Sequence, residues 1–286
     1  MTHDTTIRLL ISCPDAKGII AAVAGFIVEH GGNILYADQH TDPLTAEFFM
    51  RVEIERDGFG LHEDTFATAW SAVAARFGMS WRAYWGTRVK RMAVLASKEG
   101  HCVSDLLWRW STGELAVDIP LVVSNHDVLA DAVGGYGVEF HHEPVTASTR
   151  QRQEERLISL LGDADVDFVV LARYMQVLSP AFVAAYPAQI INIHHSFLPA
   201  FAGAQPYQQA HERGVKLIGA TSHYVTDELD QGPIIAQQTT PIGHRDTVED
   251  LIRKGRDLER VVLASAVRLH VQDRILVSGN KTVVFE

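Results

Sequence analysis

The stretch "INIHHSFLPAFAGAQPY", Ile191 to Tyr207, carries an apolar run into an asparagine and two adjacent histidines, and then turns at a proline. In an extended chain Asn192 and His194 point to the same side, and His195 points to the other. Strands often end in polar residues only because the chain reaches the surface there. The other interpretation is that these side chains line the rim of an active site.

Apolar runs alternate with helical patterns on both sides of this stretch. The runs are "RMAVLAS", "IPLVVSN", "VDFVVLARY" and "AQIINIHH". Near-continuous apolar strands that alternate with helices are typical of a mostly parallel sheet covered on both faces. Ligands of such sheets bind beyond the carboxyl ends of the strands. The place of Asn192 and His194 at the end of their run therefore favours a ligand site.

The first 85 residues follow a different order. They predict a strand over 6–13, followed by a helix that Asp15 could cap and that ends at Gly31. Two strands follow, in "NILYADQHTD" and "TAEFFMRVEIE". A helix over about 62–77 and a strand in "SWRAYWG" complete this part of the chain. This is the ferredoxin-like order, and no catalytic side chains cluster in it. We expect an α/β protein with a binding or assembly domain over 1–86, a linker over 87–90 and a second domain over 91–286.

Composition excludes several classes of protein. The chain has 286 residues, 47% of them hydrophobic, which is typical of a globular protein, and it has no apolar run of the ~20 residues that span a bilayer. Its net charge of −10 argues against binding to nucleic acid or an anionic membrane. The opening "MTHDTTIRLL" lacks a signal-peptide pattern, and Cys13 and Cys102 lie too far apart for a disulfide framework. We expect a cytoplasmic protein.

A carboxylate downstream completes a possible reactive group. Asp230 lies in "TSHYVTDELDQGPII", between two strand-like runs and just before a Gln-Gly-Pro turn. A carboxylate can orient an imidazole or act as a base for water, and an imidazole and an amide can stabilise an oxyanion. Asn192, His194 and Asp230 together suit attack on an activated carbonyl. The residue types alone leave a structural role equally open.

The fourteen histidines raise the question of a metal site. The sequence contains neither Cys-x-x-Cys nor His-Glu-x-x-His, the spacings typical of zinc sites. We expect no catalytic metal.

The N-terminal segments "CPDAKGIIAAV" and "GGNILYADQH" resemble those of ACT domains, which sense small molecules. The resemblance implies an effector pocket between paired domains that includes Asp15, Gly18 and Asn33. It also implies a homo-oligomer with an amino acid such as glycine or methionine as a possible effector. The alternative, that these residues only cap and turn the chain, stays open.

The segments "INIHHSFLPAF" and "GATSHYVTDELDQGPII" resemble those of the formyltransferases that use 10-formyltetrahydrofolate. The resemblance implies a Rossmann-like domain in which Asn192, His194 and Asp230 are catalytic. "LARYMQVLS" resembles the family segment that holds the pterin. The implied substrate contacts are Met175, Gln176, Val177, Leu178, Thr226, Asp227 and Glu228.

With an ACT-like domain in front, "ASKEGHCVSDLLWR" and "NIHHSFLPAFAGAQPYQQAHERGVKLIGATSHYV" are similar to the formyltetrahydrofolate deformylase family. The resemblance implies hydrolysis of 10-formyltetrahydrofolate to formate and tetrahydrofolate, which supplies formate for one-carbon and purine metabolism, with no cofactor. The segment from Ser97 to Asp105 has one glycine and bulky neighbours, so it is a poor backbone site for the phosphate of an acceptor. The alternatives are formyl transfer to an amine and a non-catalytic amino-acid sensor.

Overall fold

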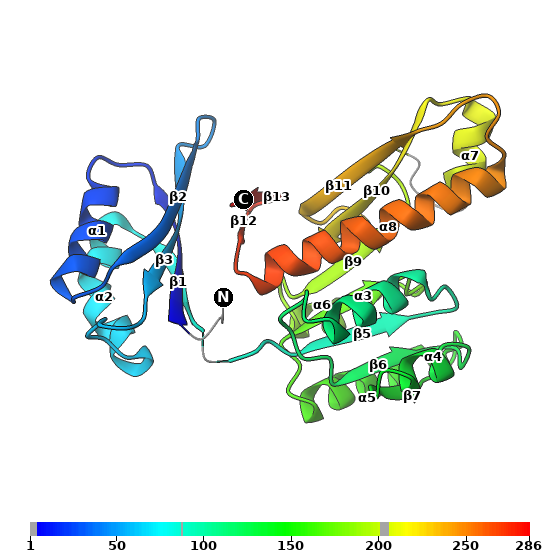
Figure 1. Ribbon diagram of the computed structural model, residues 1–286, viewed down its shortest axis with the longest axis horizontal. Helices are drawn as coiled ribbons and strands as arrows, with labels where there is room; N and C mark the ends of the chain where they lie inside the picture. Colours follow the sequence, from blue (N-terminus) through cyan, green and yellow to red (C-terminus); the bar gives the residue numbers. More distant parts are fainter. Residues whose placement is uncertain (1–4, 87, 201–205) are drawn as a thin grey trace. The chain divides into compact units, whose positions relative to one another are not determined.

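The computed structural model describes residues 5–86, 88–200 and 206–286, so Thr87 of the predicted linker and residues 201–205 of the stretch quoted above lie outside it. The chain forms two compact units (Figure 1). Unit 1 contains the described residues of 1–89 together with 272–278 and 283–286. Unit 2 contains residues 90–271 and 279–282. The functional boundaries expected at 86 and 91 stay a prediction.

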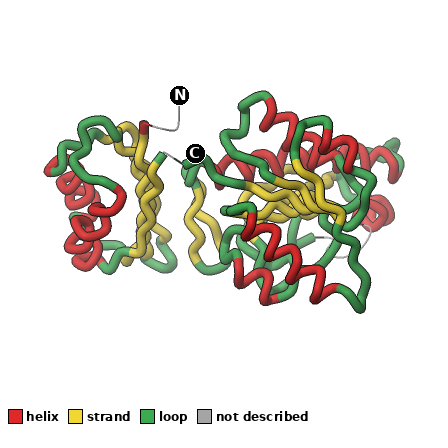
Figure 2. The backbone as a smooth tube through the Cα atoms, turned by 90° about the horizontal axis from the view of Figure 1, so that it is seen from below, coloured by secondary structure: helices red, strands yellow, loops and turns green. Residues whose placement is uncertain are grey.

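Unit 1 has the predicted ferredoxin-like order. Its elements are β1 (Thr6–Pro14), α1 (Ile19–Glu29), β2 (Ile34–Asp42), β3 (Glu47–Glu55), α2 (Glu63–Phe77) and β4 (Ser80–Trp85). The antiparallel sheet has the order β2-β3-β1-β4, and both helices cover one of its faces (Figure 2). Alternate residues of β1, such as Leu9 and Ile11, pack with Ile27 of α1 and Trp70 of α2. The α/β fold class predicted for this part of the chain is confirmed.

One local expectation was wrong, because Asp15 does not cap α1. The helix begins after Gly18, whose φ of 94° lies in the left-handed region, and no side chain caps its first turn. Glycine reaches this conformation at little cost, which explains why the turn before the helix contains one.

The C-terminal segment packs with unit 1, although the sequence analysis assigned it to the second domain. Arg51 of β3 is 1% exposed and donates from Nε to the carbonyl of Asp273 (2.7 Å) and from a terminal nitrogen to that of Gln272 (3.0 Å). Arg8 of β1 forms an ion pair with Asp273 at 2.9 Å. Buried guanidinium groups need acceptors, and this segment supplies them. It continues into the strand pair β12 (Ile275–Ser278) and β13 (Lys281–Val284).

Unit 2 is built on a seven-stranded sheet of order β11-β10-β9-β8-β5-β6-β7. The strands are β5 (Met92–Ala96), β6 (Leu121–Ser124), β7 (Glu139–His142), β8 (Phe168–Ala172), β9 (Ile190–His194), β10 (Leu217–Tyr224) and β11 (Ile234–Pro241). Strands β5 to β9 run parallel, whereas β10 and β11 are antiparallel to their neighbours. The mostly parallel sheet predicted from the apolar runs is confirmed.

Helices cover both faces of this sheet (Figure 2). They are α3 (His101–Ser111), α4 (Ala130–Gly134), α5 (Arg150–Asp163), α6 (Pro180–Ala185), α7 (Pro206–Arg213) and α8 (Val248–Val271). Helix α3 contacts α4 and α8, and α5 contacts α6 on the other face. Leu171 and Ile190 pack in the cluster that contains α5 and α6, whereas Phe168 lies 4.5 Å from the ring of His270 on α8. Alternate residues are therefore buried on opposite faces, which explains the continuous apolar runs.

Among the residues that the structure describes, no helix has both the length and the apolar character that crossing a bilayer requires.

Candidate active site

Strand pairing places Asn192 opposite His223 on β10. The Asn192 side-chain nitrogen lies 3.2 Å from Nε2 of His223, and Nδ1 of His223 lies 2.8 Å from the carbonyl of Tyr224. A carbonyl can only accept, so Nδ1 carries the proton. Burial lowers the pKa of His223, so the ring is neutral and its Nε2 accepts a hydrogen bond from Asn192. This orients the Asn192 amide and leaves its second N–H for another acceptor.

Asp230 joins this pair from the loop between β10 and β11. Its carboxylate lies 3.3 Å from Nδ1 of His194 and 3.8 Å from Nε2 of His223. The hydrogen bond with His194 lowers the pKa of Asp230 against the opposite effect of burial, so the group is a carboxylate at neutral pH. Nε2 of His194 is buried and has no hydrogen-bond partner in the described part of the chain. The structure thus brings together Asn192, His194 and Asp230 and adds His223.

The backbone around Asp230 has a special conformation. Asp230 has a φ of 56°, in the left-handed region that non-glycine residues rarely adopt. Two residues later, a Cβ on Gly232 would lie 1.8 Å from the carbonyl oxygen of Tyr224, so only glycine fits there. Backbone strain of this kind is concentrated at functional sites.

Hydroxyl groups of β10 hold the segment that follows His194. The Thr221 hydroxyl accepts a hydrogen bond from the Leu198 N–H (3.0 Å) and donates one to the carbonyl of Ser196 (2.8 Å). The Ser222 hydroxyl donates to the carbonyl of Asn192 at 3.0 Å. These bonds fix the end of β9 relative to β10, and with it the positions of the reactive side chains.

The residues expected to contact folate lie in two segments on one side of the sheet. The N–H of Met175 donates to the Ser97 hydroxyl at 3.0 Å, which ties the end of β8 to the end of β5. Leu178 and Val225 pack against the same buried cluster under α5 and α6. Met175 and Val177 are 58% and 51% exposed, and Asp227 and Glu228 are also exposed. Apolar side chains that remain exposed beside a polar group are available to a ligand.

The three expected effector residues are not adjacent within one chain. Asp15 and Gly18 are exposed in the turn before α1, and Asn33 follows that helix and donates to a carboxylate oxygen of Glu55 at 3.0 Å. Helix α1 has 11 residues, a length of about 16 Å. A pocket shared by these residues would need the turn from one chain and Asn33 from another.

Sequence analysis missed a second polar cluster, centred on Glu259 of α8, whose side chain is 1% exposed. The Tyr207 hydroxyl donates to one carboxylate oxygen at 2.6 Å. His101 Nε2 lies 2.8 Å and Arg173 Nε 3.5 Å from the other oxygen. A signal was present in the sequence, because Glu259 lies on the same helical face as Leu251, eight residues earlier, in an apolar stripe.

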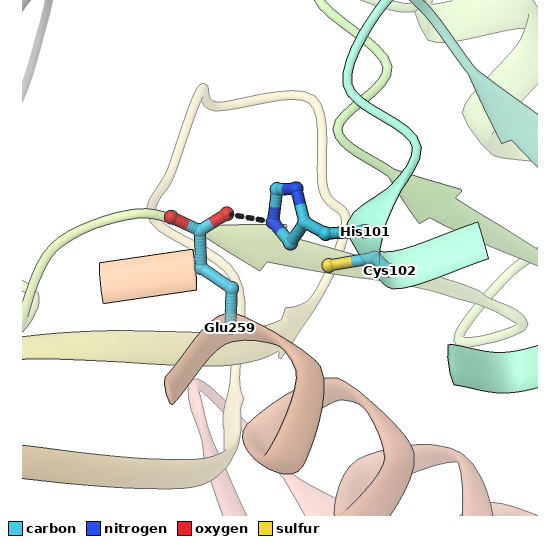
Figure 3. A group of neighbouring side chains, drawn as sticks. All are labelled: His101, Cys102 and Glu259. Carbon is cyan, nitrogen blue, oxygen red and sulfur yellow. Dashed lines mark hydrogen bonds and ion pairs between the residues drawn. The ribbon is translucent and has the colours of Figure 1, made fainter. Parts of the chain in front are cut away.

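Three side chains of this region have the chemistry of metal ligands. His101, Cys102 and Glu259 offer ligand atoms that all lie within 4.8 Å of one another (Figure 3), and such a set can hold zinc. Burial, followed by the charge of Glu259, raises the pKa of the Cys102 thiol, which keeps it protonated. Arg173 already balances the charge of Glu259. Hydrogen bonds from Tyr207 and His101 and an ion pair with Arg173 therefore occupy both oxygens of Glu259, while Nδ1 of His101 and Nε of Arg173 have no hydrogen-bond partner in the described residues.

Comparison with known proteins gives consistent results for both units. The model of the formyl transferase family matches residues 90–267, and that of the ACT domain matches residues 7–61. A formyltetrahydrofolate deformylase from Synechocystis is 52% identical, over 99% of each chain. A crystal structure of a formyltetrahydrofolate deformylase from Pseudomonas syringae superimposes with a TM-score of 0.96 at 48% identity and covers 98% of this chain and 94% of that chain.

A glycinamide ribonucleotide transformylase from Symbiobacterium toebii shares the fold of part of the chain. Its TM-score is 0.67 at 32% identity, over 71% of this chain and 97% of that one.

Proposed function

The chain belongs to the formyltetrahydrofolate deformylase family, and we propose that it hydrolyses 10-formyltetrahydrofolate to formate and tetrahydrofolate. The likeness extends over nearly the whole chain, including the ACT domain. The observation that carries the chemistry is the grouping of Asn192, His194 and Asp230 around one point at the end of β9. Formate released in this way feeds one-carbon and purine metabolism.

In the proposed mechanism Asp230 and His194 polarise a water molecule, which attacks the formyl carbon. The Asp230 carboxylate accepts a hydrogen bond from Nδ1 of His194, and Nε2 of His194, which has no partner in the described residues, is assigned to the reacting group. A C–O bond forms, the carbonyl electrons move to oxygen, and the Asp230 carboxylate accepts the proton that leaves the water. The C–N10 bond then breaks as N10 takes up a proton. No electrons are exchanged with a cofactor, and we propose that none takes part.

The oxyanion is stabilised by two donors in this proposal. Asn192 donates its second N–H, since His223 occupies the first. His194 donates from Nε2 when it carries protons on both nitrogens. Removing one such donor in other enzymes costs about 10²–10³ in turnover.

We propose that folate lies along Met175, Gln176, Val177 and Leu178, with Thr226, Asp227 and Glu228 opposite. The packing of Leu178 and Val225 on one cluster supports this assignment, because it places both segments on one side of the sheet. The exposed Met175 and Val177 provide apolar surface for a pterin.

The alternatives are less well supported. Transfer to an amine describes the transformylases, whose likeness covers only part of this chain, whereas the likeness to deformylases covers nearly all of it. A non-catalytic sensor would not need Asn192, His194 and Asp230 to be grouped as they are.

The deciding experiment is to incubate the purified protein with 10-formyltetrahydrofolate without any amine acceptor. We expect formate and tetrahydrofolate in equal amounts. Turnover that requires an added amine would favour the transferase, and folate binding without turnover would favour the sensor.

For unit 1 we propose an effector-binding and assembly role in a cytoplasmic homo-oligomer. The ACT match and the separation of Gly18 from Asn33 in one chain support a pocket between two chains. Titration calorimetry with glycine and methionine tests the effector, and light scattering tests the oligomer. Asn33→Ala should weaken binding of the amino acid, whereas Ser71→Ala, at an exposed position of α2, should not.

A further inference from the structure

The fold of unit 2 does not determine which molecule accepts the formyl group. A protein named as a transformylase shares this fold, yet the family of the present chain is named for removing the formyl group. The choice between an amine and water must therefore depend on side chains. Under the proposed function, on which the assignment of these side chains rests, they lie on the side from which the acceptor approaches the formyl carbon.

The folate and the acceptor need separate space, because both are bonded to the formyl carbon in the tetrahedral intermediate. Asn192 alternates with Ile191 and Ile193 along β9, so it points to the same face as Ile190, whose cluster lies under α5 and α6. The two candidate folate segments pack against that cluster. An acceptor would therefore approach from the other side, toward α7 and α8.

His195 turns to this other side. Its ring centre lies 5.2 Å from that of His194 and 6.1 Å from that of Tyr207 on α7. The Tyr207 hydroxyl then reaches Glu259 of α8, and His101 of α3 reaches the same carboxylate (Figure 3). Side chains in sequential contact thus connect His194, through His195 and Tyr207, to Glu259 of α8.

The side chains of this set are closely fitted. A Cβ on Gly255 of α8 would lie 1.9 Å from the Tyr207 hydroxyl, so the missing side chain makes room for the tyrosine. The ring of Tyr207 is buried with Ala210, Ile218 and Leu251. Tyr207 is therefore held in place by α8 on one side and by this cluster on the other.

Arg173 extends the set from the end of β8. Its φ is 62°, a left-handed conformation that glycine adopts easily and arginine rarely. Its side chain is 15% exposed, with Nε 3.5 Å from Glu259. Tertiary contacts therefore hold a bulky cation where a small residue would suit the backbone better.

These groups offer no nucleophile of their own. Burial and the charge of Glu259 raise the pKa of the Tyr207 hydroxyl. Burial and the charge of Arg173 lower the pKa of His195 to about 4. Burial raises the pKa of Glu259, but hydrogen bonding from His101 and the charge of Arg173 outweigh it, so Glu259 stays ionised and paired.

We propose that Arg173, Tyr207 and Glu259 form an acceptor-side wall, which leaves room for water but not for an amine acceptor. These three residues are specificity-determining and do not take part in bond making or breaking. Removing part of the wall should let a small amine compete with water.

The test compares two products from the full-length protein incubated with 10-formyltetrahydrofolate and an excess of hydroxylamine. Formate reports hydrolysis, and N-formylhydroxylamine reports transfer, after subtraction of the reaction without enzyme. Tyr207→Ala opens the wall, whereas Tyr207→Phe keeps its shape and removes only the hydroxyl. We expect the ratio of transfer to hydrolysis to rise at least about tenfold in Tyr207→Ala and to change little in Tyr207→Phe.

Arg173→Gly is a second variant that removes part of the wall, and glycine suits the left-handed backbone at this position. Arg173→Met, whose side chain has a similar length, is its control. The transfer ratio of Arg173→Gly should also rise, which keeps the test decisive if Tyr207→Ala does not fold. If Tyr207→Ala and Arg173→Gly both fold and both keep the wild-type ratio of transfer to hydrolysis, the proposed wall is wrong. It is also wrong if a folded Arg173→Gly protein loses both reactions. Absence of formate from the wild-type protein would instead overturn the proposed function, and the wall with it.

Discussion

Asp230 and Glu259, two carboxylates of unit 2, differ in how closely their partners lie. Asp230 has histidine nitrogens at 3.3 and 3.8 Å, and the His194 beside it keeps one buried nitrogen without a partner in the described structure. Glu259 has partners at 2.6 and 2.8 Å and an arginine at 3.5 Å. The Asp230 carboxylate is 18% exposed and can accept a further hydrogen bond from a substrate, whereas both oxygens of the 1% exposed Glu259 carboxylate already have partners within the protein.

The difference gives a criterion for reading polar clusters. A carboxylate that stays partly exposed and has only long contacts, as Asp230 does, can still accept a hydrogen bond from a substrate or water. A group whose bonds are complete contributes stability and shape. By this criterion Asp230 belongs to the chemistry and Glu259 to the architecture, and each of the following changes tests one side of that contrast.

The largest effect is expected from Asp230→Asn. Asparagine keeps the size of the side chain but removes the charge that pairs with His194 and activates water. We expect turnover to fall on the order of 10²-fold or more, with folate binding retained. Steady-state formate release and a separate measurement of folate affinity check this. Near-normal turnover would place the base elsewhere.

Next in size is the contrast between the two adjacent histidines. His194→Ala removes the ring that bonds to Asp230, whereas His195→Ala removes a ring that faces Tyr207. We expect His194→Ala to lower turnover about 10²-fold and His195→Ala to lower it much less. A larger loss for His195→Ala would reverse the assignment of the two faces.

Glu259→Gln should affect stability rather than the reaction. It leaves the guanidinium of Arg173 buried without its counter-charge, which costs about 3 kcal/mol in buried ion pairs of other proteins. Chemical denaturation should show the loss, and formate release per folded molecule should change less than in Asp230→Asn. Unchanged stability would show that the cluster is not structural.

The smallest effect is a pH dependence from His195. Its pKa is lowered from 6.5 to about 4 in the folded protein, mainly by burial, so the unfolded chain binds the proton more readily. Stability should therefore fall as pH drops from 6.5 toward 4, by on the order of 2 kcal/mol from this residue. His195→Gln should lose less stability than the wild type between pH 7 and pH 4.5. Equal losses in both proteins would contradict the lowered pKa.

Periodicity was sufficient for most of the fold. The period-2 and apolar patterns identified the strands of both sheets, including β8 and β9, because side-chain alternation depends only on local geometry. Asp15 was misjudged as a helix cap, since a glycine in the left-handed region can begin a helix without one. The place of the C-terminal segment was also missed, because Arg51 and Asp273 are 222 residues apart.

The amino-acid sequence by itself determined the residue types of the candidate site and their strand phase. Asn192 and His194 share a side because they are two residues apart in a strand, and Asp230 follows in a turn that its neighbours specify. Only the tertiary structure decided what surrounds them. The register of β9 against β10 placed His223 on Asn192, and two helices and one strand end converged on Glu259 of α8. Burial and long-range pairing arise from packing, which no local pattern contains.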